Sequence, residues 1–294
     1  MVMGALDGRV LDDLGLIAPI RTARPNEFRD PPGQACPFCR GNEAETPPQL
    51  GSIDAPDGRW IARAFANRFP AAQPPDGDHE VIVDTPEHAP AVTLAGIQLW
   101  RERYARALER YANAMPVLFK NAGASAGATI RHPHTQLLTI ARPIPYWERL
   151  STQARAYAMR TGECCWCQDL RTAGSQARVV AAHLGVVAFV PSRQRFDGLL
   201  RIVPERCEPS FALAQAAELQ GLASLLGAAA SALQADAFNV YFEGDPHAER
   251  GVAHWHADVV PRATTLAGFE LASELPILAA GPQESAERWR QMLT

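Results

Sequence analysis

The sequence is nearly without lysine: Lys120 is the only one among 28 basic residues, and arginine supplies the rest. A P-loop needs Gly-Lys followed by Ser or Thr, and Lys120 is followed by Asn121, so that phosphate-binding loop is absent. Schiff-base chemistry would depend on Lys120 alone, which disfavours that class of mechanism.

The chain also lacks a surplus of positive charge and any long apolar run. Its 294 residues carry a formal net charge of -4, so the sequence predicts no nucleic-acid partner. No stretch approaches the roughly 18 uninterrupted apolar residues that span a membrane. The N-terminal segment 1–15 contains three acids and no apolar run, unlike a signal peptide. These absences predict a soluble, cytoplasmic protein without a membrane partner.

The six cysteines gather in three places. They are Cys36 and Cys39, then Cys164, Cys165 and Cys167, then Cys207. In a cytoplasmic chain disulfides are disfavoured, and paired Cys-x-x-Cys spacing favours a metal ion.

The first half of the chain has an ordered series of features. A Cys-x-x-Cys pair at 36–39 precedes a strand-like stretch over 79–88. A helical pattern of apolar residues follows over about 94–115. An apolar run then leads to the motif His-Pro-His-Thr-Gln at 132–136.

The second half repeats that order. The Cys cluster precedes strand-like stretches over 186–191 and 199–207, the second ending in Cys207. A helical pattern over about 211–233 and a strand over 238–244 lead to His-Trp-His-Ala-Asp at 254–258.

Spacing supports duplication of one unit. After the Cys pair, the intervals to the next two metal-type residues are 49 and 44 residues in the first half, against 40 and 47 in the second. The sequence therefore predicts an α+β fold of two tandem units, each an antiparallel sheet with helices. We place the units at 1–145 and 146–294, joined near the Pro-containing segment 141–155.

Two metal sites follow from this order, because zinc favours tetrahedral sets of thiolates and imidazoles. Site one is predicted to be a closed structural set of Cys36, Cys39, His88 and His132. Site two is predicted to be a set of Cys164, Cys167, Cys207 and His254, with Cys165 left over. The alternative for site two is a group of buried thiols that has lost its ion.

His134 is the candidate nucleophile. In an extended strand, residues two apart face the same side, so His132, His134 and Gln136 lie in a row. A zinc ion on His132 would fix the neighbouring imidazole, which suits reversible attack on an α-phosphorus. Gln136 can donate to a phosphate oxygen, and small residues over 121–129 can bring backbone N–H groups close to phosphate.

The corresponding row of the second half ends in a carboxylate. Asp258 stands where the first half has Gln136, and a carboxylate repels a phosphate diester. The sequence therefore predicts that only the first half carries the covalent step.

Together these motifs resemble the galactose-1-phosphate uridylyltransferase family, the transferase branch of the histidine-triad superfamily. The segments that carry the resemblance are IAPIRTARP, ACPFCRGNEAETPP, HEVIVDTPEH, RHPHTQ, HWHADVVPR and AGFELAS. The resemblance implies two histidine-triad-like halves, a dimer, a nucleotidyl-histidine on His134 with Gln136 binding phosphate, and zinc on site one.

The resemblance further implies a set of substrate-binding residues. They are Arg21 and Arg24 near phosphate, Asn67 and Asn121 near the nucleotide, and Glu270 near the hexose. Gly123 and Thr129 join this set from the small-residue segment 121–129, whose backbone N–H groups can approach phosphate. The expected partners are a nucleotide sugar and a sugar phosphate.

Three functions remain open. The first is transfer of UMP from UDP-glucose, or another UDP-sugar, to a hexose 1-phosphate. The second is a phosphorylase of a nucleoside-diphosphate sugar or dinucleoside polyphosphate, of the ADP-glucose or Ap4A type, with the same intermediate. The third is a zinc-stabilised nucleotide-binding protein without activity.

Overall fold

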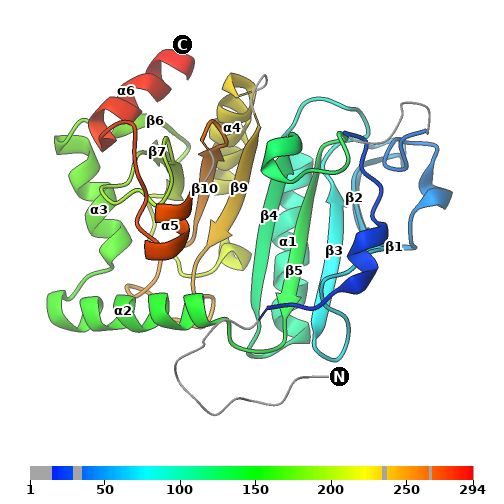
Figure 1. The fold of residues 1–294 in the computed structure, drawn as a ribbon, viewed down its shortest axis with the longest axis horizontal. Coiled ribbons are helices and arrows are strands. Elements are labelled where there is room, and N and C mark those ends of the chain that lie inside the picture. The colour runs from blue at the N-terminus through cyan, green and yellow to red at the C-terminus, as the bar shows by residue number, and fades with distance from the viewer. Residues whose placement is uncertain (1–14, 29–34, 234–236, 265–266, 294) are drawn as a thin grey trace.

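The computed structural model describes residues 15–28, 35–233, 237–264 and 267–293. Its centre is one antiparallel sheet of ten strands flanked by helices (Figure 1). The α+β fold class predicted from the sequence is confirmed. Most of the acidic N-terminal segment 1–15 lies outside the described residues.

Each half of the chain contributes five strands. The first half supplies β1 (Gln49–Asp54), β2 (Trp60–Ala66), β3 (Gly77–Val83), β4 (Met115–Ala122) and β5 (His134–Ile140). The second half supplies β6 (Val179–His183), β7 (Val186–Phe189), β8 (Leu200–Pro204), β9 (Phe238–Glu243) and β10 (His256–Pro261).

The strand order repeats between the halves. Across the sheet it runs β1-β2-β3-β5-β4-β9-β10-β8-β7-β6, so both halves use the same order and meet where β4 pairs with β9. This repeat agrees with duplication of one unit, but the two sheets are joined into one. The unit boundary between 145 and 146 stays a prediction.

Six α-helices accompany the sheet within the described part of the chain. They are α1 (Leu94–Arg110), α2 (Pro145–Thr161), α3 (Cys165–Ser175), α4 (Ala216–Ala232), α5 (Gly268–Ser273) and α6 (Pro282–Leu293). In Figure 1, α1 lies behind the first-half strands, and the segment that follows residue 15 crosses their other face.

The helix α1 begins where the sequence predicts and ends earlier. Thr93 caps it, since its hydroxyl accepts a hydrogen bond from the Gly96 amide at 3.0 Å. Ile97, Trp100 and Tyr104 recur at helical spacing and are buried against the sheet. The helix stops at Arg110 rather than 115, because residue 115 already pairs with β5 as the first residue of β4.

The helix α4 is shorter than predicted at its start. Residues 211–213 form a separate 3-10 turn, and the helix begins at Ala216, where Gln215 and Glu218 make a capping box. Its buried leucines join α1 and both half-sheets in one hydrophobic core. The opposite face of the first half-sheet is therefore left for loops and a cavity.

Candidate active site and metal centres

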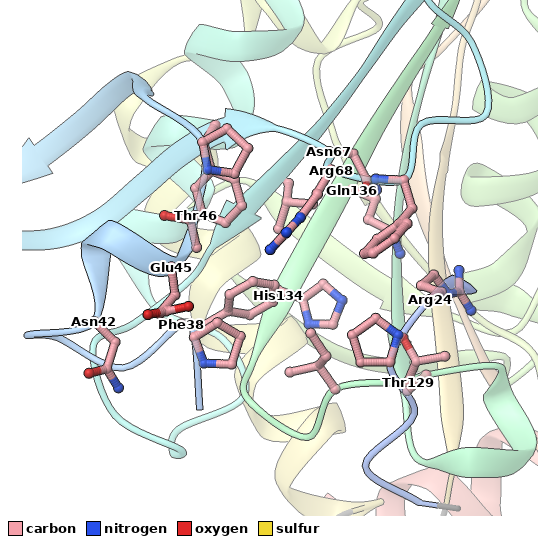
Figure 2. A pocket seen from close by; sticks show the side chains of 18 of the residues that line it. Arg24, Phe38, Asn42, Glu45, Thr46, Asn67, Arg68, Thr129, His134 and Gln136 are labelled. Carbon is pink, nitrogen blue, oxygen red and sulfur yellow. Dashed lines mark hydrogen bonds between the residues drawn. The ribbon is translucent and has the colours of Figure 1, made fainter. Parts of the chain in front are cut away.

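A cavity of about 470 Å³ opens on the face of the first half-sheet away from α1. Its walls come from segments far apart in the chain, namely 24–25, 35–47, 65–69 and 127–130, and from side chains of β3 and β5. His134 and Gln136 both line it, as their spacing in a strand predicts (Figure 2).

The His134 ring is fixed in one orientation. Its Nδ1 lies 2.8 Å from the main-chain oxygen of His132, so Nδ1 carries the proton and Nε2 keeps its lone pair. The Phe38 ring packs edge-on against it, with centroids 5.3 Å apart. Burial lowers the pKa of His134 to about 4, so the imidazole is neutral at neutral pH. A neutral, oriented imidazole in a cavity is a competent nucleophile.

Gln136 is oriented by His79, a residue that the sequence motifs do not mark. The Ala71 amide donates to His79 Nδ1 at 3.0 Å, which leaves the His79 proton on Nε2. That Nε2 lies 3.1 Å from Gln136 Oε1 and donates to it. The Gln136 amide oxygen is thus occupied, and its NH₂ group is available to a ligand in the cavity.

The predicted phosphate and nucleotide residues divide into two groups. Arg24, Asn67 and Thr129 line the cavity. Arg21 lies at its edge, where its guanidinium donates to the Phe69 carbonyl at 3.0 Å. Burial lowers the pKa of both Arg21 and Arg24. The part of the cavity next to these two arginines is therefore positively charged and partly desolvated.

Asn121 and Gly123 do not line the cavity. The Asn121 amide oxygen accepts a hydrogen bond from Asn239 at 2.8 Å, across the junction of the two half-sheets. Gly123 has φ +82, and a Cβ there would meet the Cβ of Ala237 at 2.8 Å. These two residues therefore hold the loop 123–129 against the second half.

Glu270 lies away from His134. It lines a second cavity, of about 600 Å³, together with residues of α2 and the 195–196 segment. Its carboxylate also accepts the Ala267 amide at 3.0 Å at the start of α5. The structure does not bring Glu270 to the first cavity, and its assignment to a hexose stays a prediction.

The four residues of metal site one converge on a single point. Their ligand atoms all lie within 4.8 Å of one another. His132 Nδ1 lies 3.6 Å from Cys36 Sγ and 3.7 Å from Cys39 Sγ, and Cys39 Sγ lies 3.3 Å from His88 Nε2. Zinc bonded tetrahedrally at its usual lengths separates S and N ligands by about 3.6 Å.

The surroundings of site one also suit a metal ion. His132 Nε2 lies 2.8 Å from the Thr85 carbonyl oxygen, the outer hydrogen bond that fixes a metal-bound imidazole. Burial raises the pKa of the Cys36 thiol to about 11, so a thiolate there needs a neighbouring cation. The donor set therefore fits zinc.

The four residues predicted for site two also meet. The ligand atoms of Cys164, Cys167, Cys207 and His254 lie within 4.8 Å of one another. Cys167 Sγ is 3.4 Å from His254 Nδ1, a zinc-like separation. Cys165 is absent from this cluster, as the sequence predicts. The cluster could hold an ion in the manner of site one.

The second half contains an arrangement like that of His134, but its histidine does not face a cavity. His256 Nδ1 lies 2.9 Å from the His254 carbonyl oxygen. The Trp166 ring lies against His256 at a tilt of 40°, with centroids 5.9 Å apart, whereas Phe38 contacts His134 edge-on. His256 is fully buried, and its Nε2 faces Glu243 Oε2 at 3.3 Å rather than a cavity.

Asp258, which occupies the position equivalent to Gln136, is also buried and paired within the protein. Asp258 is 1% exposed and takes two hydrogen bonds from Arg201, at 2.8 and 2.7 Å. The carboxylate is thus neutralised internally. This geometry supports a covalent step in the first half alone.

No family model matches the sequence. In an alignment of 317 residues, the chain is 25% identical to ADP-glucose phosphorylase from Arabidopsis thaliana. The alignment covers 94% of this chain and 89% of that protein. Over 156 residues it is 27% identical to galactose-1-phosphate uridylyltransferase from Streptomyces lividans, covering 51% of this chain and 42% of that protein.

Two solved structures have the same fold. An ADP-glucose phosphorylase from Arabidopsis thaliana with bound ADP-glucose aligns with a TM-score of 0.79 at 22% identity, over 90% of this chain and 92% of that one. A uridylyltransferase aligns with a TM-score of 0.74 at 22% identity, over 90% and 92% of the two chains. None of the described helices combines the length and apolar composition of a membrane span.

Proposed function

We propose that this nucleotidyltransferase, which is similar to ADP-glucose phosphorylase and to galactose-1-phosphate uridylyltransferase, works through a covalent nucleotidyl-histidine on His134. The single observation that carries the proposal is the geometry of His134, whose Nε2 makes no hydrogen bond within the described residues and whose ring lines the same cavity as Arg24. The family resemblance predicted from the motifs is confirmed at the level of relatives and fold.

The reaction has two balanced displacements. His134 Nε2 attacks the α-phosphorus of a nucleoside-diphosphate sugar, a P–N bond forms, and the P–O bond to the departing sugar 1-phosphate breaks. An oxygen of the acceptor then attacks the same phosphorus, and the P–N bond breaks. The Gln136 amide and the Arg24 guanidinium are placed to stabilise charge on the non-bridging oxygens.

Zinc enters this proposal as a structural ion. Cys36, Cys39, His88 and His132 would hold it at site one, and its charge would keep the thiolates together and fix the strand entry that precedes His134. The second set would clamp α3 to the segment before β10. A homodimer and a cytoplasmic location stay predictions.

Two candidates remain for the nucleotide. A UDP-sugar:hexose-1-phosphate uridylyltransferase uses a uracil base, and an ADP-glucose or Ap4A phosphorylase uses adenine. One feature favours a base with an amino group. Figure 2 shows Asn42 and Glu45 on the side of the cavity away from Arg24, with His134 between them.

The Glu45 carboxylate is exposed to the cavity, in contrast with its neighbour Glu43. Glu43 is committed to the Trp60 indole at 2.7 Å, whereas Glu45 takes no side-chain hydrogen bond within the part of the chain that the structure describes. An acidic group and a cationic group on opposite sides of His134 favour binding of the base near Glu45 and of the phosphates near Arg24. A carboxylate accepts hydrogen bonds from the adenine amino group, whereas uracil offers it only N3–H, which lies between two carbonyl oxygens that the carboxylate repels.

Intact-mass measurement tests the proposed function and names the base. The protein is incubated separately with UDP-glucose, ADP-glucose and Ap4A, and the mass of the covalent adduct identifies the transferred nucleotide. Failure of all three to modify the protein would contradict the nucleotidyl-histidine. A UMP adduct alone would contradict the argument from Glu45 and favour the uridylyltransferase.

Replacing Glu45 tests the base preference directly. Glu45→Gln keeps the shape and adds a donor, so we expect the ratio of kcat/KM for ADP-glucose over UDP-glucose to fall by about 10-fold, equivalent to one charged hydrogen bond. Glu43→Gln is the matched control, because that side chain faces Trp60. If the ratio of kcat/KM for the two substrates is unchanged in Glu45→Gln, Glu45 does not select the base.

The pairing of His79 with Gln136 gives a second expectation. Gln136→Leu removes an oxyanion donor and should slow adduct formation by about 10²–10³-fold. His79→Phe leaves the Gln136 amide present but free to rotate, so a fall of about 10-fold in the rate of adduct formation is expected. Because His79 also contacts the Asn67 amide at 3.2 Å, the nucleotide Kd is measured separately. Rapid-quench measurement of the first turnover separates these effects. Equal rates in His79→Phe and the unaltered protein would show that His79 does not orient Gln136.

A further inference from the structure

The only lysine of the chain is buried directly behind the proposed nucleophile. Lys120 projects from β4 onto the α1 face of the sheet and is 2% exposed. Its Nζ lies 2.7 Å from Asp84 Oδ2, and it donates to the main-chain oxygen of His134 at 3.2 Å. Asp84, which follows β3, is completely buried.

Asp84 and Lys120 make hydrogen bonds to three consecutive residues, namely Pro133 just before β5 and the first two residues of β5. The Asp84 amide donates to the Pro133 carbonyl at 3.1 Å, and Lys120 donates to the His134 carbonyl. The Thr135 hydroxyl donates to Asp84 Oδ2 at 3.0 Å. The other carboxylate oxygen accepts the Trp100 indole N–H at 2.6 Å, so the carboxylate is also anchored to α1.

Stability alone does not account for this pair. Removing an ammonium and a carboxylate from water costs several kcal/mol per ion, and replacement of a buried ion pair by apolar residues is often neutral or stabilising. Lysine suits the place because its compact ammonium can donate to two oxygens in different directions. The pair is therefore better explained by the backbone that it holds in place, at residues 133–135, than by a gain in stability from its burial.

The second half provides an internal comparison. Ala257 on β10 takes the place of Thr135, and its neighbour Phe242 on β9 takes the place of Lys120. The register of β8 against β10 likewise puts Pro204 in the place of Asp84. The half whose second histidine faces Glu243 thus has apolar residues at all three positions.

We propose that Asp84 and Lys120 are positioning residues for His134. The His134 ring is held through its bond to the His132 carbonyl, so its place in the cavity follows from the backbone over 132–135. The pair fixes that backbone from behind, and Thr135 extends it. This inference rests on the proposed role of His134 as nucleophile.

The test is a double variant that removes both charges without leaving a buried one unpaired. In Lys120→Met/Asp84→Asn, the new amide can accept from Trp100 and donate to Thr135, while methionine fills the space of the lysine stem. We expect adduct formation in the first turnover to slow by about 10–100-fold, as for a small misplacement of a reacting group. Nucleotide Kd and zinc content should stay unchanged.

A matched control removes another ion pair of the same half that is largely buried. Arg103 on α1 donates to Glu80 on β3 through two hydrogen bonds of 2.8 Å, and neither side chain makes a hydrogen bond to residues 132–135 in the described part of the chain. Arg103→Met/Glu80→Gln should therefore leave the rate of adduct formation unchanged, whatever its effect on the unfolding temperature. Slowing in the control equal to that in the test variant would overturn the inference.

Two further outcomes decide the inference. If the test variant does not fold, Thr135→Val removes one bond of the network with little change in volume, and a rate equal to that of the unaltered protein would overturn the proposal. An absent adduct in the unaltered protein contradicts the proposed function itself. A normal adduct there, formed equally fast in Lys120→Met/Asp84→Asn, overturns only the positioning role.

Discussion

His134→Asn protein is expected to carry no covalent nucleotide after incubation with any nucleoside-diphosphate sugar. Asparagine has no lone pair able to attack phosphorus, while its small polar side chain fits the space of the imidazole. Turnover should fall by at least about 10⁴-fold, because loss of a covalent nucleophile has effects of this order. Intact mass and acid lability of the label measure the result, since a phosphoramidate breaks in acid.

The second half supplies a control for this variant. His256 has the equivalent main-chain hydrogen bond and an aromatic neighbour, Trp166, but its Nε2 faces Glu243. His256→Asn should keep the adduct and the ability to pass the nucleotide to an acceptor, even if the protein unfolds at lower temperature. A stable label on His134→Asn, or its loss from His256→Asn, would move the covalent step to the other half.

Much of the fold follows from features that the sequence displays locally. Helical spacing of apolar residues marks α1 and α4, and short apolar runs mark strands such as β3 and β7. The ends of these elements are less visible, because α1 stops where β4 must begin pairing with β5. The helix α2 is not predicted, because the prolines of segment 141–155 are typical of a connection between units, and α3 is not predicted either.

The candidate site divides in the same way. Cysteine pairs and histidines at repeated spacing predict the two metal clusters, because few other arrangements need those residue types together. Single polar residues on neighbouring strands give no such signal. His79 and Asp84 look like ordinary strand residues until register sets them beside Gln136 and Thr135. Lys120 stands out in the sequence only as the sole lysine, since its partners lie 14 and 36 residues away.

Loss of a ligand from site one is expected to remove both stability and activity. Structural zinc in small domains contributes apparent binding free energies of about 10–16 kcal/mol at neutral pH, which act as folding free energy. In Cys39→Ser we expect one zinc equivalent to be lost and the unfolding temperature to fall by more than about 10 °C, at roughly 2–4 °C per kcal/mol. Adduct formation should also fail, because segment 35–47 lines the cavity and His132 anchors the His134 ring.

Cys167→Ser is the matched variant at site two and separates folding from function. Its thiol lies 3.4 Å from His254, on the half whose second histidine is buried against Glu243. We expect this variant to lose the other zinc equivalent and some stability, while it still forms the His134 adduct below its unfolding temperature. Metal analysis should therefore find about two equivalents in the unaltered protein and about one in each variant. One equivalent in the unaltered protein, unchanged by Cys167→Ser, would mean that the second cluster consists of packed thiols without an ion.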